Sequence, residues 1–166
     1  MEELRTLHLD QNEIAGPAVV TRSLTKRFGK ITAVSNLSLE VERGEIFGFL
    51  GLNGAGKTTT IRMLLDLLRP ESGEAFILGY HCRLQGIQAR ALVGYLPGEM
   101  GLYGDLSGQQ LLDLFAALGA RQVRRDYQAQ LLERLELPAS DLHRKLRTYS
   151  TGMKRKLGLI QAFQSD

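Results

Sequence analysis

The sequence predicts an α/β fold, and three features of its hydrophobic pattern support that prediction. The short apolar run of residues 45–50 is typical of a buried strand, and a glycine-rich loop joins it to the helical pattern of residues 58–68. The other strand-like segments all lie before residue 97. From Ser107 onward the pattern is helical almost throughout, so we expect an α/β part followed by a helical subdomain.

The expected elements of the α/β part are short and separated by turn residues. We expect a turn at residues 28–30, a bend near Asn36 and a second turn at Arg43 and Gly44. Pro70 ends the helix that follows the glycine-rich loop. The predicted strands are residues 18–24, 31–41, 45–50, 73–79 and 93–96, and a short helix is predicted at residues 86–92.

Two capping signals mark helix starts in the C-terminal part. Ser107 and Gln110 have the spacing of a capping box, just ahead of the apolar run of residues 111–118. Ser150 is placed to cap a last helix. Between these two starts we expect helices at residues 121–136, which Pro138 ends, and at residues 142–146.

Composition and charge narrow the class of protein. The 166 residues include 21 basic and 18 acidic side chains, and the net charge of +3 is too balanced to predict a nucleic-acid partner. No apolar run approaches the ~20 residues that span a bilayer, and the N-terminus lacks the pattern of a signal peptide. Cys82 is the only cysteine, so no disulfide forms within the chain and we expect a reducing compartment.

The most specific signal is the segment Gly51-Leu52-Asn53-Gly54-Ala55-Gly56-Lys57-Thr58, which fits the phosphate-binding P-loop pattern G-x-x-x-x-G-K-[ST]. Its setting between an expected strand and an expected helix is the one that this motif needs. A glycine-rich turn that carries a surface lysine is the alternative interpretation.

Each residue type in this loop suits the binding of phosphate. Gly51, Gly54 and Gly56 let the backbone curl around an anion at φ angles that a side chain resists, so that N–H groups point at phosphate oxygens. The helix N-terminus adds positive potential. Lys57 supplies a point charge for the β- and γ-phosphates, and the Thr58 hydroxyl is placed to ligate Mg²⁺.

Three further stretches resemble motifs of the ABC family of ATPases. Residues 149–157, Tyr-Ser-Thr-Gly-Met-Lys-Arg-Lys-Leu, resemble the signature motif in the form common in ABC-2-type exporters. Residues 93–97 resemble the segment that leads into the family's Q-loop, and residues 24–29 resemble its adenine-stacking A-loop. The resemblance covers about residues 18–166, and residues 1–17 are expected to be a tail.

The resemblance implies a P-loop NTPase fold that has an N-terminal β part, a P-loop strand–helix core and a helical subdomain carrying the signature. It places the β and P-loop core at residues 18–97, the helical subdomain at residues 98–150 and the signature helix at residues 150–166. It also implies that ATP and Mg²⁺ are bound.

Individual residues receive roles from the same resemblance. Phe28 would stack on adenine, and the alternative is a core phenylalanine in a turn. Ser150 and Gly152 would contact the γ-phosphate of ATP held by a second nucleotide-binding domain, and the alternative for Ser150 is a plain N-cap. Thr58 would ligate Mg²⁺. The phosphates and Mg²⁺ together would be held by Asn53, Gly54, Ala55, Gly56, Lys57, Thr58 and Thr59.

A transmembrane permease subunit is a further implied partner, and it would hold the chain at the cytoplasmic face of the membrane. Leu102, Tyr103 and Leu106 lie where the family's surface groove would receive a coupling helix from that subunit. Ordinary core packing is the alternative for these three residues.

The chain departs from the family pattern at two places. Gly98 stands where the Q-loop glutamine is expected, and whether Glu99 or a water replaces that glutamine stays open. The family's Walker B strand, catalytic glutamate and switch histidine follow the signature helix, whereas this sequence stops at Asp166. We therefore expect a cassette that is incomplete at its C-terminus, with Glu99 as the one catalytic candidate and no ATP turnover by residues 1–166 alone.

The leading functional prediction is the ATP-binding subunit of an ABC transporter, an exporter by its signature, whose complete form hydrolyses ATP to drive transport. Two alternatives stay open from the sequence. One is a soluble ABC-family ATPase, and the other is a nucleotide-binding module that regulates a partner without hydrolysis.

Overall fold

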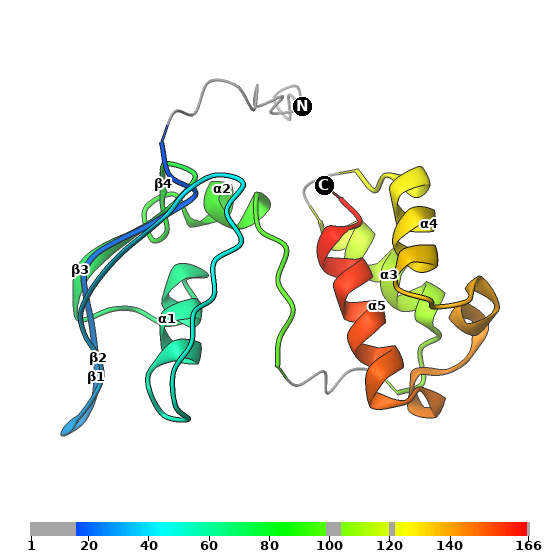
Figure 1. Cartoon of the computed structure of the whole chain (residues 1–166), viewed down its shortest axis with the longest axis horizontal. Helices are drawn as coiled ribbons and strands as arrows, with labels where there is room; N and C mark the ends of the chain where they lie inside the picture. Colours follow the sequence, from blue (N-terminus) through cyan, green and yellow to red (C-terminus); the bar gives the residue numbers. More distant parts are fainter. Residues whose placement is uncertain (1–15, 99–103, 120–121, 166) are drawn as a thin grey trace, which may run out of the picture. The chain divides into compact units, whose positions relative to one another are not determined.

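The computed structural model describes residues 16–98, 104–119 and 122–165. Its backbone forms two compact units, residues 1–92 and 93–166. The described strands lie in the first unit and the second unit is helical, which confirms the predicted order of an α/β part and a helical part (Figure 1). Among the described residues, no helix has the length and apolar character that crossing a membrane requires. The finer domain boundaries expected from the sequence stay a prediction.

The first unit is built on an antiparallel sheet (Figure 1). The sequence predicts its three longer strands and misses the shortest one. The four strands of the sheet are β1 (Val19–Phe28), β2 (Ile31–Val41), β3 (Ser72–Ile77) and β4 (Tyr80–His81). Their order across the sheet is β2-β1-β3-β4. Apolar side chains from three of these strands are buried, namely Leu24, Val34, Ala75 and Ile77.

The β1–β2 hairpin bends at Asn36, where the sequence predicts a bend. Asn36 has a φ of 50°, and the register between the two strands shifts beside it. Its N–H donates to Thr25 Oγ1 at 3.0 Å, and the Thr21 hydroxyl donates to the Leu37 carbonyl at 3.0 Å. Hydroxyl groups thus satisfy backbone groups that the irregular ladder leaves unpaired.

The helix that follows the glycine-rich loop is shorter than predicted. α1 (Lys57–Leu64) packs against β2 and β3, whereas the sequence predicts a helix at residues 58–68. Asp66 takes a left-handed conformation with a φ of 54°, and the Leu67 N–H donates back to the Arg62 carbonyl at 2.9 Å. This turn closes the helix before the proline is reached.

α2 (Gly86–Ala91) confirms the predicted short helix of the first unit. Its Arg90 reaches the end of α1, where the guanidinium donates to the Leu65 carbonyl at 3.4 Å and lies 3.6 Å from the Asp66 carboxylate. Ala89 is fully buried. Arg90 therefore attaches α2 to the C-terminal end of α1 by a hydrogen bond and an ion pair.

Two of the predicted strands are wrong. Residues 45–50 and 93–96 have no regular secondary structure, and Ile46 and Leu50 are 100% and 90% exposed. A strand forms only when a neighbouring strand completes its ladder of hydrogen bonds, and none of the strands in the described residues pairs with either segment. An apolar run by itself does not supply that neighbour.

The second unit packs three helices around a leucine-rich core: α3 (Gly108–Leu118), α4 (Arg125–Arg134) and α5 (Thr151–Phe163) (Figure 1). The predicted capping box is present, because the Ser107 hydroxyl accepts from the Gln110 N–H at 3.2 Å and the Gln110 side chain accepts from the Ser107 N–H at 2.8 Å. The residues with no exposed surface in this core are Leu111, Leu112, Leu157 and Ile160.

The connection from α4 to α5 differs from the prediction. α4 is shorter than residues 121–136, and the helix predicted at residues 142–146 is replaced by two 3-10 segments, η1 (Ala139–His143) and η2 (Leu146–Thr148). Arg144, between them, is extended with a ψ of 151°, which interrupts any continuous helix. Buried leucines anchor this segment instead, because Leu142 and Leu146 both belong to the core.

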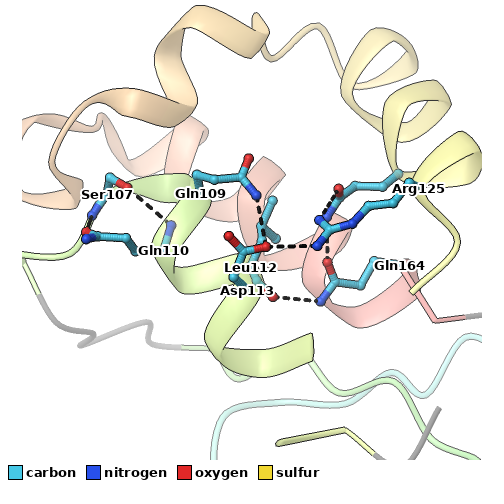
Figure 2. A network of polar contacts seen from close by, with 8 residues as sticks. Ser107, Gln109, Gln110, Leu112, Asp113, Arg125 and Gln164 are labelled. Carbon is cyan, nitrogen blue, oxygen red and sulfur yellow. Dashed lines mark hydrogen bonds and ion pairs between the residues drawn. The ribbon is translucent and has the colours of Figure 1, made fainter. Parts of the chain in front are cut away.

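A network of polar side chains connects the three helices at Gln164, which follows α5 (Figure 2). Gln164 is 1% exposed; its Oε1 accepts from Gln128 Nε2 at 2.8 Å and its Nε2 donates to the Leu112 carbonyl at 3.3 Å. Gln128 in turn accepts from Arg125 at 3.0 Å, and Arg125 pairs with Asp113 at 3.1 Å. Residues far apart in the sequence therefore connect the middle of α3 to the start of α4 and the end of α5.

We expect Gln164→Leu to lower the free energy of unfolding by about 1–3 kcal/mol, because it leaves the buried Nε2 of Gln128 without its acceptor and removes the side-chain hydrogen bond to the Leu112 carbonyl. Urea unfolding followed by far-ultraviolet circular dichroism measures the loss. Gln109→Leu is the matched control, since the Gln109 side chain donates to the exposed Asp113 carboxylate and to no buried group among the described residues. Equal losses in the two variants would contradict a special role for Gln164.

Candidate phosphate-binding site

Two glycines of the loop adopt the backbone conformation that the motif requires. Gly54 and Gly56 have φ angles of 85° and 86°, in the left-handed region that side chains resist. The loop tightens where the Ala55 N–H donates to the Leu52 carbonyl at 3.1 Å. Gly56 is also the N-cap of α1, so the loop runs directly into the N-terminus of the helix.

The close approach of β2 makes a glycine necessary at position 56. A Cβ atom there would lie 2.3 Å from the Ala33 carbonyl oxygen and 3.0 Å from Val34 Cγ2, both on β2. At Gly54, by contrast, no atom lies within 4 Å of an added Cβ. One end of the loop is thus seated on the sheet, and its middle faces open space.

The N-terminus of α1 offers donors to an anion. The first N–H groups of a helix have no carbonyl partner within it, and Gly56 has no side chain to cap them. The helix dipole adds positive potential at the same place. Six of the eight loop residues are exposed, which leaves the loop accessible: Gly51, Leu52, Asn53, Gly54, Ala55 and Thr58.

Lys57 folds back over the loop. Its ammonium donates to the Gly51 carbonyl at 2.6 Å and to the Leu52 carbonyl at 2.8 Å, so the charge lies against the loop backbone and does not extend into solvent. An ammonium has three N–H donors, and these bonds use two of them. These bonds place the ammonium over the loop, and its contact with phosphate stays a prediction.

The three consecutive threonines have different surroundings. Thr60 is buried, and its hydroxyl donates to the Gly56 carbonyl at 3.0 Å, which ties the first turn of α1 to the loop. Thr58 is exposed and Thr59 is half-buried. Thr58 is therefore the most accessible of the three to a metal ion. Sequence reasoning missed the anchoring role of Thr60, whose signal is a threonine at the fourth position of the helix.

A metal at this loop would depend on the phosphates for most of its ligands. Among the described residues, no three His, Cys, Asp or Glu side chains come together to hold a metal ion. Mg²⁺ typically combines one or two protein oxygens with phosphate oxygens and water. A single exposed hydroxyl at Thr58 fits that arrangement, and the loop alone does not form a metal site.

Phe28 stands at the end of β1, next to the hairpin turn. Its side chain is 50% exposed, and the Lys26 ammonium lies 5.4 Å from the centre of its ring. A half-exposed ring argues against the alternative of a core phenylalanine. The stacking of adenine on this ring stays a prediction.

Ser150 is the N-cap of α5, which agrees with the alternative interpretation of this residue as a plain N-cap. Its hydroxyl accepts from the Met153 N–H at 3.2 Å. Ser150 and Gly152 are both exposed, and a Cβ added at Gly152 would meet only Ser150 Oγ, at 3.8 Å. The start of α5 is thus open to a ligand, and contact with a γ-phosphate stays a prediction.

Tyr149 anchors the start of the signature segment, and sequence reasoning missed it. Its side chain is 5% exposed, and its hydroxyl donates to the Asp141 carbonyl at 2.7 Å. Burial raises the pKa of Tyr149, and the Asp141 carboxylate adds to that rise. The hydroxyl fills the space beside Gly108, where a Cβ would lie 2.3 Å from it. An aromatic residue just before a helix cap is the signal that could have found it.

The remaining candidates from the sequence have mixed outcomes. Glu99, Leu102 and Tyr103 lie outside the described residues. Gly98 is exposed, and nothing lies within 4 Å of an added Cβ. Leu106 packs against the core of the second unit, as the packing alternative for it predicts. Cys82 is buried, and burial is the main reason that its pKa rises to about 11, so it stays a thiol near neutral pH.

Comparison with known proteins gives a consistent family. The family model described as ABC transporter matches residues 34–166. The daunorubicin resistance ATP-binding protein DrrA3 of Streptomyces coeruleorubidus is 40% identical over 157 residues, which are 92% of this chain and 49% of that protein. The probable multidrug ABC transporter ATP-binding protein YbhF of Escherichia coli (strain K12) is 39% identical over 112 residues, 68% of this chain and 19% of that protein.

Solved structures share the fold. The structure of an ATP-binding subunit of an ABC transporter superimposes with a TM-score of 0.77 at 28% identity, covering 89% of this chain and 62% of that one. A dimeric ATP-binding cassette bound to ADP and Pi superimposes with a TM-score of 0.75 at 22% identity, covering 89% of this chain and 69% of that one. The chain spans half or less of the two curated relatives, 49% and 19% of their lengths. It belongs to the ABC transporter family.

Proposed function

We propose that the chain is the nucleotide-binding part of the ATP-binding subunit of an ABC transporter, and that it binds Mg-ATP at residues 51–58. The observation that carries this proposal is the loop itself: two left-handed glycines lead into the N-terminus of α1, with the Lys57 ammonium over the loop backbone. That arrangement provides an anion site of backbone donors and one positive charge. The names of the two curated relatives, both ATP-binding proteins, support the same ligand.

Each site residue receives a role under this proposal. Lys57 leaves the Gly51 and Leu52 carbonyls and contacts the β- and γ-phosphates, while Thr58 ligates Mg²⁺. Phe28 stacks on adenine. The backbone donors come from the segment that comprises Asn53, Gly54, Ala55, Gly56 and Thr59.

The complete protein would hydrolyse ATP and use it to drive export. Its ATP-bound form would pair two nucleotide-binding domains, with Ser150 and Gly152 of one chain at the γ-phosphate held by the other. The exposed, capped start of α5 supports this role. A permease subunit would hold the pair at the cytoplasmic face of the membrane. The drug-resistance and multidrug names of the two relatives support an exporter.

We expect Phe28→Ala to lower the affinity for Mg-ATP by roughly fivefold to a hundredfold, because stacking a base contributes about 1–3 kcal/mol. The affinity for inorganic triphosphate, which has no base, should not change. Titration of both ligands against a fluorescent ATP analogue measures the two affinities. Ile31→Ala, on the residue that faces Phe28 across the hairpin, is the matched control. Equal losses for both ligands would make Phe28 a packing residue.

Purified residues 1–166 should bind ATP without turning it over. Phosphoryl transfer needs a positioned nucleophile as well as neutralised charge, and the loop supplies only the charge. A phosphate-release assay with Lys57→Ala as the blank measures this. Steady turnover that Lys57→Ala abolishes would contradict the expectation and assign the water-positioning role to a carboxylate of this chain, with Glu99→Gln as the next variant to assay.

A further inference from the structure

We propose that Arg144 is a positioning residue that sets the place of Ser150 and Gly152 at the start of α5. Its guanidinium donates through Nη1 to the Asp141 carboxylate at 2.8 Å and through Nη2 to the Thr148 carbonyl at 3.2 Å. Thr148 lies two residues before Ser150, the N-cap of α5. Under the proposed function Ser150 and Gly152 contact the γ-phosphate held by a second chain, and the role of Arg144 rests on that function.

Asp141 holds the same stretch of backbone by a second route. Its carbonyl accepts from the Tyr149 hydroxyl at 2.7 Å, and Tyr149 immediately precedes Ser150. The side chain of Asp141 is 22% exposed and that of Arg144 is 49% exposed, so solvent screens their ion pair only in part. The carboxylate and the carbonyl of one residue therefore fix two consecutive residues ahead of the cap.

The segment that carries Arg144 is itself attached to the start of α3. The Gly108 N–H donates to the Arg144 carbonyl at 3.3 Å, and the Leu146 N–H donates to the Leu106 carbonyl at 2.9 Å. Leu146 is 3% exposed and belongs to the core of the second unit. Because its own backbone is fixed in this way, Arg144 holds the Thr148 carbonyl in one place relative to the core.

The start of α5 needs this support because the turn itself is open to solvent. The Ser150 hydroxyl accepts from the Met153 N–H at 3.2 Å, and both Ser150 and Gly152 are exposed. Groups that bind a ligand have to be held within about 0.5 Å of the productive geometry by the residues that support them. The bonds of Arg144 and Tyr149 fix the backbone just before this turn and so limit where Ser150 moves.

Amide hydrogen exchange of the Met153 N–H, followed by NMR on the 166-residue chain without nucleotide, tests whether Arg144 holds the cap. We expect exchange at least about threefold faster in Arg144→Met, which removes the guanidinium and keeps a long side chain. Exchange of the Leu157 N–H, on a fully buried residue of α5, should not change, which shows that the fold is intact. Arg147→Met is the matched control, because the ion pair of Arg147 with Asp105 is exposed.

Arg144→Lys provides the second variant. It keeps the positive charge, but an ammonium lacks the planar fork with which the guanidinium bridges two acceptors. We expect exchange of the Met153 N–H about twofold faster than in the wild type. Exchange unchanged in both Arg144 variants, or raised equally in Arg147→Met, would overturn the proposal whether or not the chain binds nucleotide.

Sedimentation velocity with Mg-ATP tests the functional part. We expect the chain to associate in Mg-ATP, about threefold or more weakly in Arg144→Met and unchanged in Arg147→Met, whereas titration gives all three the same affinity for Mg-ATP. Equal association of Arg144→Met and wild type would overturn the proposal and leave the pairing of two chains standing. A wild-type chain that binds Mg-ATP without associating would contradict that pairing, and the positioning role would fall with it.

Discussion

Lys57→Ala is expected to lower the affinity of the chain for Mg-ATP by about tenfold to a hundredfold, because a hydrogen bond to a charged group contributes roughly 1.5–3 kcal/mol. The Lys57 ammonium already lies over the loop, 2.6 Å from the Gly51 carbonyl and 2.8 Å from the Leu52 carbonyl. A phosphate entering the loop exchanges these neutral acceptors for anionic oxygens, which bind an ammonium more strongly. Titration with a fluorescent ATP analogue measures the change.

The control for this variant is Lys30→Ala, which removes an exposed lysine from the hairpin turn of the same unit. It should bind Mg-ATP as the wild type does. Far-ultraviolet circular dichroism checks that Lys57→Ala keeps its fold, since Gly51 and Leu52 are exposed and water can replace the lysine at their carbonyls. Equal affinity in wild type and Lys57→Ala would remove the assignment of Lys57 to the phosphates.

Gly56→Ala should lower the free energy of unfolding more than any other single change in the loop. The φ of 86° costs a side chain about 1–2 kcal/mol. The new Cβ would also lie 2.3 Å from the Ala33 carbonyl oxygen, which is backbone and cannot rotate away. We therefore expect a loss of at least about 2 kcal/mol, together with loss of ATP binding as the loop moves off β2.

Gly54→Ala separates the two causes of that loss. Gly54 has nearly the same φ, 85°, but an added Cβ there meets nothing within 4 Å. Backbone strain alone should lower the free energy of unfolding by about 1–2 kcal/mol in this variant. Urea unfolding of the two variants side by side gives both values. If Gly56→Ala were no less stable than Gly54→Ala, the seating of the loop on β2 would not matter to stability.

The elements that sequence reasoning predicted are those with local signals. The capping box of Ser107 and Gln110, the N-cap at Ser150 and the bend at Asn36 each depend on residues within a few positions of one another. A side chain that satisfies a nearby backbone group acts in much the same way in any fold. These features therefore appear in the structure where the sequence predicts them.

The predicted fold is wrong where interactions between distant residues determine the structure. Residues 45–50 have the composition of a buried strand, but a strand requires a partner that their own sequence does not encode. The end of α1 depends on the left-handed conformation of Asp66. Aspartate tolerates this conformation, but the presence of an aspartate does not by itself predict it. The pair of Gln128 and Gln164 joins residues 36 positions apart, and nothing in the local pattern connects them.

In the candidate site, too, features with a local sequence signal were predicted and features that depend on tertiary contacts were missed. The left-handed conformations of Gly54 and Gly56 could be predicted because the P-loop pattern is local, whereas the contact of Lys57 with phosphate stays a prediction. Thr60 and Tyr149 were missed because both are buried residues with a positioning role. Thr60 holds the loop in place, and Tyr149 holds the signature segment. The contact of Gly56 with Ala33 also escaped prediction, since it depends on how β2 passes behind the loop.

Isothermal titration calorimetry of the wild-type chain with ATP and with AMP, each with Mg²⁺, tests the central claim most directly. The claim is that the loop of residues 51–58 binds the β- and γ-phosphates of a nucleotide. The result that we predict is saturable binding of Mg-ATP at one site per chain, at least about tenfold tighter than AMP, because AMP lacks the phosphates that Lys57 and the helix N-terminus contact. Absence of saturable heat with Mg-ATP, or equal affinity for ATP and AMP, would contradict the account.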